Sequence, residues 1–209
     1  LQWAIDVPDA IERAVLIGAS SRLTAMNIAF SAVARHAIMG DPGFAGGAYA
    51  DEGGPRHGLS VARMLAHITY LSEQAFTEKF DRRLQHPGEP HRDFGIDFAV
   101  ESYLDYQARS FLERFDALTY LYLSRVMDYF EPFADPDAVR RIASGGTRFL
   151  ALSFDSDWRF DTKQSLRIVD VLEAGGVPVR FREITSPWGH DSFLMELPGY
   201  QSEVAAFLC

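Results

Sequence analysis

Short apolar runs alternate with longer helical patterns toward both ends of the chain. A near-continuous apolar run covers residues 14–18, and two further strand-like runs cover 148–154 and 177–184. Runs of this kind are typical of strands that are buried on both faces of a parallel sheet. Apolar positions at helical spacing follow the first two runs, over 24–38 and 163–174. The pattern predicts an α/β fold with three strands.

The middle of the chain has a different character. It carries helical patterns over 59–79 and 100–130 and no convincing core strand. A helical insertion of this length between the strands of an α/β sheet is typical of a lid, although plain core helices are the alternative interpretation. We therefore expect a partial α/β core formed by residues 1–57 and 142–209, with a helical lid or cap formed by residues 58–141.

The composition is that of an ordinary soluble globular protein. The 209 residues are 47% hydrophobic and 23% charged, and the formal net charge is −9. This charge argues against binding to a phosphate backbone, so we expect no nucleic-acid partner. No apolar run approaches the roughly 20 residues that a membrane span needs, and the single cysteine, Cys209, excludes an internal disulfide framework. We expect a cytoplasmic protein with no membrane attachment, no metal and no bound cofactor.

A histidine near the C-terminus is the strongest sign of chemistry. His190 lies between glycine and aspartate, in a loop after the last predicted strand, where an α/β-hydrolase-type fold has its catalytic base. Asp155 and Asp157 both follow the preceding strand and are candidates for the acid. Residues two apart on a strand share a face, so the spacing alone does not choose between them. Acid before histidine is the chain order of this fold.

The nucleophile of such a site has no candidate in the sequence. No Gly-x-Ser-x-Gly elbow occurs in the 209 residues, and the chain begins inside a helical pattern. We therefore interpret it as the C-terminal part of an α/β-hydrolase fold whose nucleophile lies upstream of Leu1. We expect this part alone to be inactive and either to aggregate or to be molten. A chain that is complete as given would instead be a non-catalytic binding remnant.

Several short motifs lie in order along nearly the whole chain: Gln2–Ile5, Asn27–Phe30 with Asp41-Pro42, Gly58–Met64 with His67–Tyr70, Val100–Leu104, Arg114–Asp116, Asp157-Trp158 and Gly189–Asp191. Together they resemble the motifs of the homoserine O-acyltransferases of methionine biosynthesis, which have the α/β-hydrolase fold. The resemblance implies a transfer of the acyl group from acyl-CoA, through an upstream acyl-serine, to L-homoserine. It also implies a homodimer formed through the lid helices.

The resemblance assigns the catalytic pair. His190 is the implied base, against the alternative of an ordinary loop histidine. Asp157 is the implied acid, because the Asp-Trp pair matches the family there, and Asp155 is then expected to be solvated. The acid would hold the histidine tautomer and stabilise its imidazolium form.

The resemblance also implies residues that bind the substrate. Arg63 would bind the homoserine carboxylate rather than form a structural ion pair, since a guanidinium suits bidentate contact with a carboxylate. Asp191 would bind the amino group rather than be a solvated carboxylate. Tyr70 lies two helical turns after Arg63 and would contact the substrate rather than only pack.

The acyl donor depends on weaker features. Arg159, together with the Thr69–Ser72 form, resembles the branch of the family that uses succinyl groups. A cation beside the acyl pocket would pair with the distal carboxylate of a succinyl group, although Arg159 would equally suit the CoA phosphates or the surface. We favour succinyl-CoA over acetyl-CoA as the donor. A serine O-acyltransferase or an esterase on the same scaffold is the alternative activity.

Overall fold

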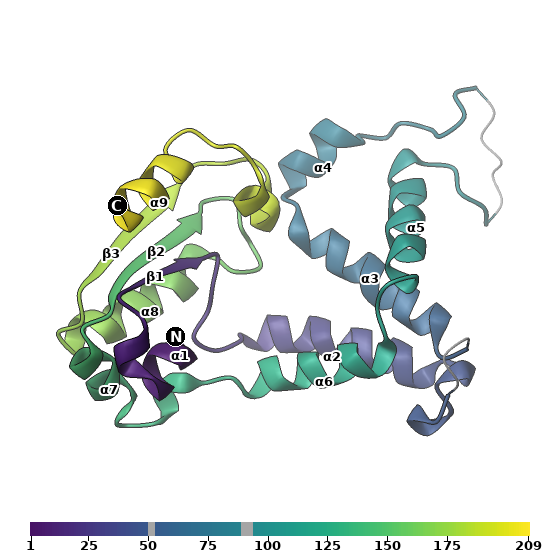
Figure 1. Ribbon diagram of the computed structural model, residues 1–209. Helices are drawn as coiled ribbons and strands as arrows, with labels where there is room; N and C mark the ends of the chain where they lie inside the picture. The colour runs from purple at the N-terminus through teal and green to yellow at the C-terminus, as the bar shows by residue number, and fades with distance from the viewer. Residues whose placement is uncertain (50–52, 89–93) are drawn as a thin grey trace. The chain divides into compact units, whose positions relative to one another are not determined.

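The computed structural model describes residues 1–49, 53–88 and 94–209 (Figure 1). The chain forms two compact units, and each is described by itself. We call them the sheet unit and the helical unit. The sheet unit comprises residues 1–23, 70–72 and 129–209, and the helical unit comprises residues 24–69 and 73–128.

Three parallel strands form the centre of the sheet unit: β1 (Arg13–Ile17), β2 (Arg148–Phe154) and β3 (Val179–Ile184). Their order in the sheet is β1-β2-β3, with Leu16 of β1 opposite Ala151 and Ala151 opposite Phe181. Six of the seven residues of β2 are buried, as expected for a central strand covered on both faces. The three strands predicted from the apolar runs are confirmed.

Alternate residues of β2 contribute to two separate cores. Phe149 packs with Ile5 and Ile142 in one cluster, to which α1 (Gln2–Asp6), α7 (Ala138–Gly145) and α8 (Thr162–Ala174) contribute. Leu150, Leu152 and Phe154 pack in the other, together with Tyr200 of α9 (Tyr200–Leu208). Successive side chains of a strand point to opposite faces, so this alternation shows that helices cover both sides of the sheet.

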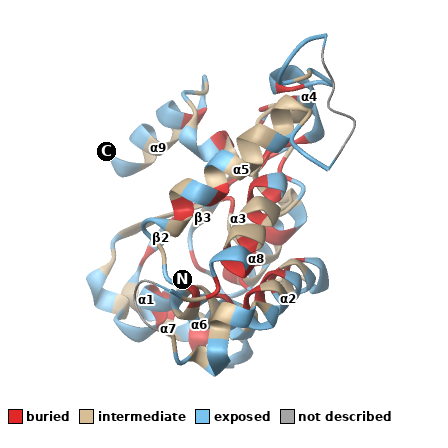
Figure 2. Ribbon diagram, turned by 90° about the vertical axis from the view of Figure 1, so that its right-hand side faces the viewer, coloured by how far each residue is buried: buried red, intermediate tan, exposed pale blue. Residues whose placement is uncertain are grey.

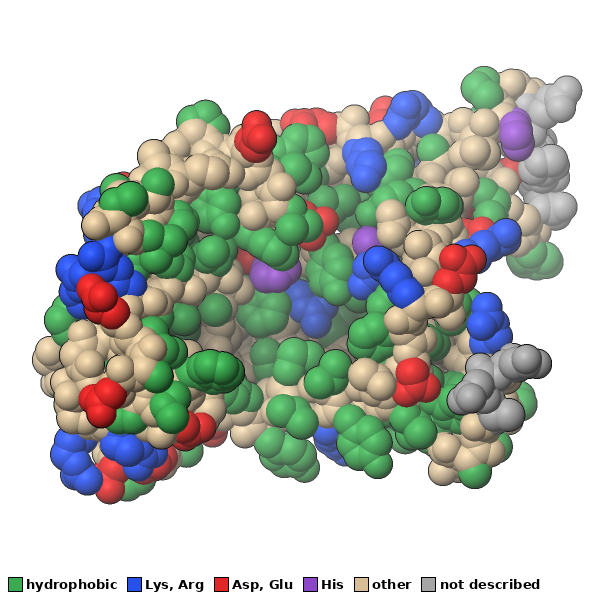
Figure 3. Space-filling model, in the orientation of Figure 1, with side chains coloured by type: hydrophobic (Ala, Val, Ile, Leu, Met, Phe, Trp, Pro, Cys, Tyr) green, Lys and Arg blue, Asp and Glu red, His purple; other side chains and the backbone are tan. Residues whose placement is uncertain are grey.

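The outer surface of the sheet unit carries both signs of charge. Basic and acidic side chains are interspersed there rather than gathered into one patch (Figure 3). Glu203 of α9, for example, forms ion pairs with Arg180 and Arg182 of β3.

The helical unit consists of five α-helices in its described residues: α2 (Ala25–Gly40), α3 (Arg56–Tyr70), α4 (Glu73–Lys79), α5 (Ala99–Leu112) and α6 (Ala117–Tyr129). Helices α2 and α3 have buried and exposed residues along their length (Figure 2). Their buried residues form one cluster with residues of α5 and α6. No helix in the described ranges has both the length and the apolar character of a membrane span.

Four short 3-10 helices complete the described structure: Pro8–Ala10, Pro42–Gly47, Pro132–Ala134 and Gly189–Leu194, the last of which is η4.

An ion pair is buried in the helical unit. The Arg35 guanidinium of α2 lies 2.7 Å from Asp128 Oδ2, and both side chains are less than a tenth exposed. The contact joins opposite charges without a well-aligned hydrogen bond to the carboxylate. Arg35 also donates a hydrogen bond to Ser124 Oγ at 3.2 Å. Buried charges need partners of this kind, so the pair restrains α2 against α6.

The helical segments differ from the prediction in two places. The helix predicted over 59–79 ends at Tyr70 and begins again at Glu73. The helix predicted over 100–130 is divided into α5 and α6, because Asp116 Oδ2 accepts a hydrogen bond from Thr119 N at 2.7 Å and caps the second helix. Helix α7 was not predicted.

The expected domain boundaries were 57/58 and 141/142. The two compact units divide the chain at other residues. Helix α2 belongs to the helical unit, because its Ala34 and Ile38 pack with Leu59 and Ala62 of α3 rather than with the sheet. Residues 129–141 belong to the sheet unit.

Candidate active site

The candidate catalytic residues follow the carboxyl ends of the strands. Gly18 follows β1, Asp157 follows β2, and His190 follows β3. In a parallel sheet these ends share one edge, which is where α/β folds place their ligands. The fold therefore brings together residues that are up to 172 positions apart in the sequence, as the positions of Gly18 and His190 show.

Asp157 and His190 form a hydrogen-bonded pair. His190 Nδ1 lies 2.7 Å from Asp157 Oδ2; the acid side chain is fully buried and the histidine side chain is 18% exposed. A carboxylate only accepts hydrogen bonds, so Nδ1 carries the hydrogen and Nε2 is left to exchange a proton with a reacting group. Asp157 Oδ1 accepts from the backbone N–H groups of Arg159 and Phe160, at 3.1 and 2.8 Å. Both oxygens of the acid are therefore held in place.

Backbone contacts hold the histidine loop. Ser186 N donates to Asp155 Oδ1, and Gly189 N donates to Ser156 Oγ, each at 2.9 Å. Ser192 Oγ donates to Gly189 O at 2.6 Å. Asp155, which was expected to be solvated, is exposed but also anchors this loop. The two loops that carry the acid and the base are thus joined at two points besides the catalytic hydrogen bond.

Aromatic rings surround the imidazole of His190. The ring centroids of Phe160, Phe193 and Tyr70 lie 4.9, 5.4 and 6.3 Å from that of His190. The two phenylalanines were not predicted, since aromatic residues in these loops have no distinctive spacing. Their rings restrict the orientations that the imidazole can adopt.

Gly18 approaches the catalytic pair closely. Its φ is +51°, and a Cβ there would lie 3.3 Å from His190 Cε1 and 3.5 Å from Asp157 Oδ2. A positive φ favours glycine, and the close approach adds a steric reason. The signal in the sequence is a glycine that immediately ends an apolar strand, which the sequence analysis left without a role.

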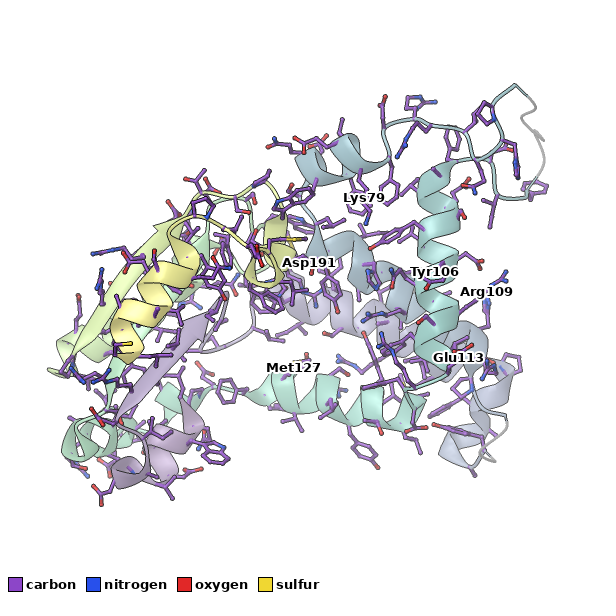
Figure 4. The ribbon with its side chains drawn as sticks, turned by 45° about the horizontal axis from the view of Figure 1, so that its top comes forward. Lys79, Tyr106, Arg109, Glu113, Met127 and Asp191 are labelled. Carbon is purple, nitrogen blue, oxygen red and sulfur yellow. The ribbon has the colours of Figure 1, made fainter. Side chains whose placement is uncertain are left out.

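The other predicted site residues are distributed over both units. Tyr70 belongs to the sheet unit and lies beside His190. Asp191 lies on η4 next to the base (Figure 4). The guanidinium of Arg159 lies 5.9 Å from the centroid of Phe160, whose ring packs on His190. Arg63 lies on α3 in the helical unit.

A cluster of basic residues surrounds a buried histidine in the helical unit. His67 Nδ1 lies 3.1 Å from the Tyr103 hydroxyl, and Lys79 Nζ lies 4.3 Å from the centroid of the Tyr103 ring. Arg63 stacks its guanidinium over Phe111 at 4.6 Å. Burial lowers the pKa of His67 to about 4, and the nearby charges of Arg63, Lys79 and Arg114 contribute to the same shift. His67 is therefore neutral at physiological pH. Its place in a family motif was the only sign of His67 in the sequence.

The described residues contain no group of three or more histidine, cysteine, aspartate or glutamate side chains placed to hold a metal ion. The chemistry that this geometry supports is proton transfer at His190 Nε2, oriented by Asp157.

Comparison with known proteins agrees with this fold. The profile of the alpha/beta hydrolase fold family matches residues 1–197, and the chain belongs to this family. The resemblance to the homoserine O-acyltransferases is confirmed by relatives that align with the whole chain. A homoserine O-succinyltransferase of Nocardioides sp. is 54% identical over 209 residues, which are 100% of this chain and 56% of that protein. A homoserine O-acetyltransferase of Rhodopseudomonas palustris is 49% identical over 211 residues, or 100% of this chain and 53% of that protein.

Solved structures show the same fold. The homoserine O-acetyltransferase from Bacillus anthracis has a TM-score of 0.84 at 21% identity, over 99% of this chain and 56% of that one. Esterase E22 has a TM-score of 0.81 at 19% identity, over 98% of this chain and 55% of that one. The chain spans about half the length of the curated relatives it matches.

Proposed function

We propose that the protein to which this chain belongs transfers an acyl group from acyl-CoA to the side-chain hydroxyl of L-homoserine. The observation that carries the proposal is the 2.7 Å hydrogen bond between His190 and the buried Asp157. It is supported by two relatives that align with all of this chain, at 54% and 49% sequence identity. They are named homoserine O-succinyltransferase and homoserine O-acetyltransferase. In this proposal the nucleophile is a serine supplied by sequence that precedes Leu1.

The proposed reaction has two steps that share one base. In the first, His190 Nε2 takes the proton of the serine hydroxyl, whose oxygen attacks the thioester carbonyl. The C–S bond breaks, and His190 returns the proton to the departing CoA sulfur. In the second, His190 takes the proton of the homoserine hydroxyl, which attacks the acyl-serine. The serine oxygen leaves and receives that proton. Asp157 stabilises the imidazolium form in both steps.

Three residues are proposed to bind the acceptor. L-Homoserine presents a carboxylate and an ammonium group, and an enzyme selects such a molecule with opposite charges at two points. Arg63 is proposed for the carboxylate and Asp191 for the ammonium group. Tyr70 is proposed as a wall of the acceptor site, which is supported by its position 6.3 Å from the His190 ring.

Succinyl-CoA is the proposed donor. The support comes from Arg159, because its guanidinium and the catalytic imidazole both lie near the ring of Phe160, 5.9 and 4.9 Å from its centroid. A cation at this point suits the distal carboxylate of a succinyl group, which an acetyl group lacks. The acyl donors of the relatives include both, by name.

The proposed protein is a cytoplasmic homodimer without a cofactor. A dimer contact through the helical unit is supported by exposed apolar side chains on α6, including Tyr122, Val126 and Met127. Because the proposed nucleophile precedes Leu1, residues 1–209 alone should not transfer acyl groups.

The test is steady-state kinetics on the protein as its source makes it, with homoserine, serine or water as the acceptor. We expect homoserine to be the preferred acceptor. Replacement of Asp157 by Asn should lower kcat by about 10³- to 10⁴-fold, because the histidine tautomer is lost. Asp170→Asn, an exposed position on α8, is the matched control.

The donor is tested with the same preparations. The ratio of kcat/KM for succinyl-CoA to that for acetyl-CoA should exceed one and should fall in Arg159→Ala. Faster transfer to water than to homoserine would identify an esterase and overturn the proposal. An unchanged donor ratio in Arg159→Ala would remove only the role of Arg159.

A further inference from the structure

One tripeptide of the chain lies outside the unit that its sequence neighbours form. Residues 24–69 and 73–128 form the helical unit, but Tyr70–Ser72 between them belongs to the sheet unit. The tripeptide is also where the predicted continuous helix is interrupted, between α3 and α4. An interruption of a strongly helical pattern needs a tertiary cause, since nothing local in Tyr-Leu-Ser forbids a helix.

The loop of the catalytic acid supplies one part of that cause. Trp158 Nε1 donates a hydrogen bond to the Leu71 carbonyl at 3.0 Å, across 87 positions of the sequence. The Trp158 side chain remains 41% exposed, so hydrophobic burial alone does not account for its placement. Trp158 is adjacent in sequence to Asp157, and the contact therefore ties the tripeptide directly to the acid.

The histidine loop supplies the other part. Ser72 Oγ donates a hydrogen bond to the Pro187 carbonyl. Gly189 packs against the backbone of the same segment, where a Cβ would lie 2.5 Å from Ser72 N and 2.7 Å from the Leu71 carbonyl carbon. Gly189 has a φ of +69° and precedes His190, so glycine is required there both by conformation and by contact.

The three segments restrain one another in a closed set. The acid loop and the histidine loop are joined by the catalytic hydrogen bond and by Ser156 Oγ with Gly189 N. Each loop is joined in turn to the tripeptide. The result is that Tyr70 is held beside the imidazole of His190. We call the contacts of Tyr70–Ser72 with Trp158, Pro187 and Gly189 the clasp.

We propose that Trp158 is a positioning residue for the catalytic pair. Its indole N–H holds the Leu71 carbonyl, and through it the clasp fixes Tyr70 against His190. Trp158 contacts no reacting atom in this role and acts through Tyr70. The kinetic consequence rests on the proposed function, whereas the structural consequence does not.

The first experiment measures amide hydrogen exchange in the native-length protein and in Trp158→Phe, which removes the donor and keeps an aromatic ring. Exchange should rise severalfold in peptides covering residues 70–73 and 186–190. Ser72→Ala should raise exchange in the same two peptides. The matched controls are Trp3→Phe, where the residue is 73% exposed, and Ser202→Ala, whose hydroxyl donates to the Gly199 carbonyl at the start of α9. Both controls should leave these peptides unchanged.

The second experiment is a double-mutant cycle on acyl transfer. Trp158→Phe should lower kcat/KM by about fivefold, as expected for one lost hydrogen bond. In a Tyr70→Ala background the same substitution should change kcat/KM by less than about twofold, because the residue through which Trp158 acts is gone. A residue that only supports the fold would cost the same in both backgrounds.

The outcomes separate the two proposals. If the native protein transfers no acyl group but exchange rises in both peptides, the clasp stands and the proposed function fails. If acyl transfer occurs and Trp158→Phe and Ser72→Ala leave exchange in both peptides unchanged, the clasp is wrong. If Trp158→Phe does not fold, the test is made with Ser72→Ala alone, by hydrogen exchange and by acyl transfer.

Discussion

The candidate acid and base owe their geometry both to their neighbours in the chain and to groups that lie far from them in the sequence. Both oxygens of Asp157 accept hydrogen bonds, one from His190 and the other from two backbone N–H groups of its own turn. The imidazole is bounded by rings from three segments. Chain order and the glycine-flanked histidine predicted the base and left Asp155 and Asp157 as candidate acids, and only the family resemblance selected Asp157. The rings and Gly18 were not predictable, because their roles depend on which strand ends become neighbours in space.

At the same scale, His67 makes stability depend on pH. Its pKa in the folded protein is lowered to about 4, mainly by burial, from an ordinary value of 6.5. Between these values the unfolded chain binds a proton that the folded chain does not, so the stabilising effect is complete above pH 6.5 and is lost as the pH falls toward 4. We expect the free energy of unfolding to fall by up to about 1.4 kcal/mol per pH unit in this window.

The measurement is chemical denaturation between pH 4 and 7. The variant His67→Gln should show a flatter dependence, because glutamine does not titrate. His36→Gln, at an exposed position of α2, should keep the native slope. Equal slopes in the native protein and in His67→Gln would show that another group is responsible.

At the scale of helices and strands, prediction succeeded where the pattern itself carries the information. Strand β2 was predicted residue for residue, because a central parallel strand is apolar on both faces. The break between α3 and α4 was missed, because the hydrogen bonds that hold Leu71 and Ser72 come from residues 87 and 115 positions away. Helix α2 was grouped with the sheet for the same reason: its partner α3 is identified only by the packing.

The contact between α2 and α3 depends on a glycine. A Cβ on Gly58 would lie 2.3 Å from the Ala37 carbonyl oxygen, so the two helix backbones approach closely there. Gly58→Ala should lower the free energy of unfolding by about 1–3 kcal/mol, as overpacking commonly does. Gly40→Ala is the matched control, since nothing lies within 4 Å of a Cβ at that helical position. Thermal denaturation of both variants gives the comparison, and equal melting temperatures would contradict the steric argument.

For the molecule as a whole, the two compact units predict two regions of local stability. Ile142 in the sheet unit and Ile38 in the helical unit are both fully buried, each in a separate apolar cluster. Replacement of either isoleucine by valine should lower the free energy of unfolding by about 1 kcal/mol. Hydrogen exchange should report the loss only in the unit that carries the substitution, because cooperative units open separately.

The alternative for the whole molecule is a single cooperative unit. In that case Ile142→Val would lower protection equally in residues 24–69 and in residues 129–209. Such a result would mean that a loss of stability in one unit lowers the stability of the other unit to the same extent.

The position of Tyr70–Ser72 bears on how proteins of this kind can be recombined. The helical unit looks like a simple insertion, entered at residue 24 and left at residue 128. It is in fact attached to the sheet unit a third time, in its middle, through a tripeptide that the catalytic loops hold. In a chimera that takes its helices from one relative and its sheet from another, the tripeptide and the loops that hold it can come from different relatives. The two sides of this attachment stay matched if Trp158 and Gly189 are transferred together with the helices. Successful exchanges in nature and in the laboratory should preserve this match.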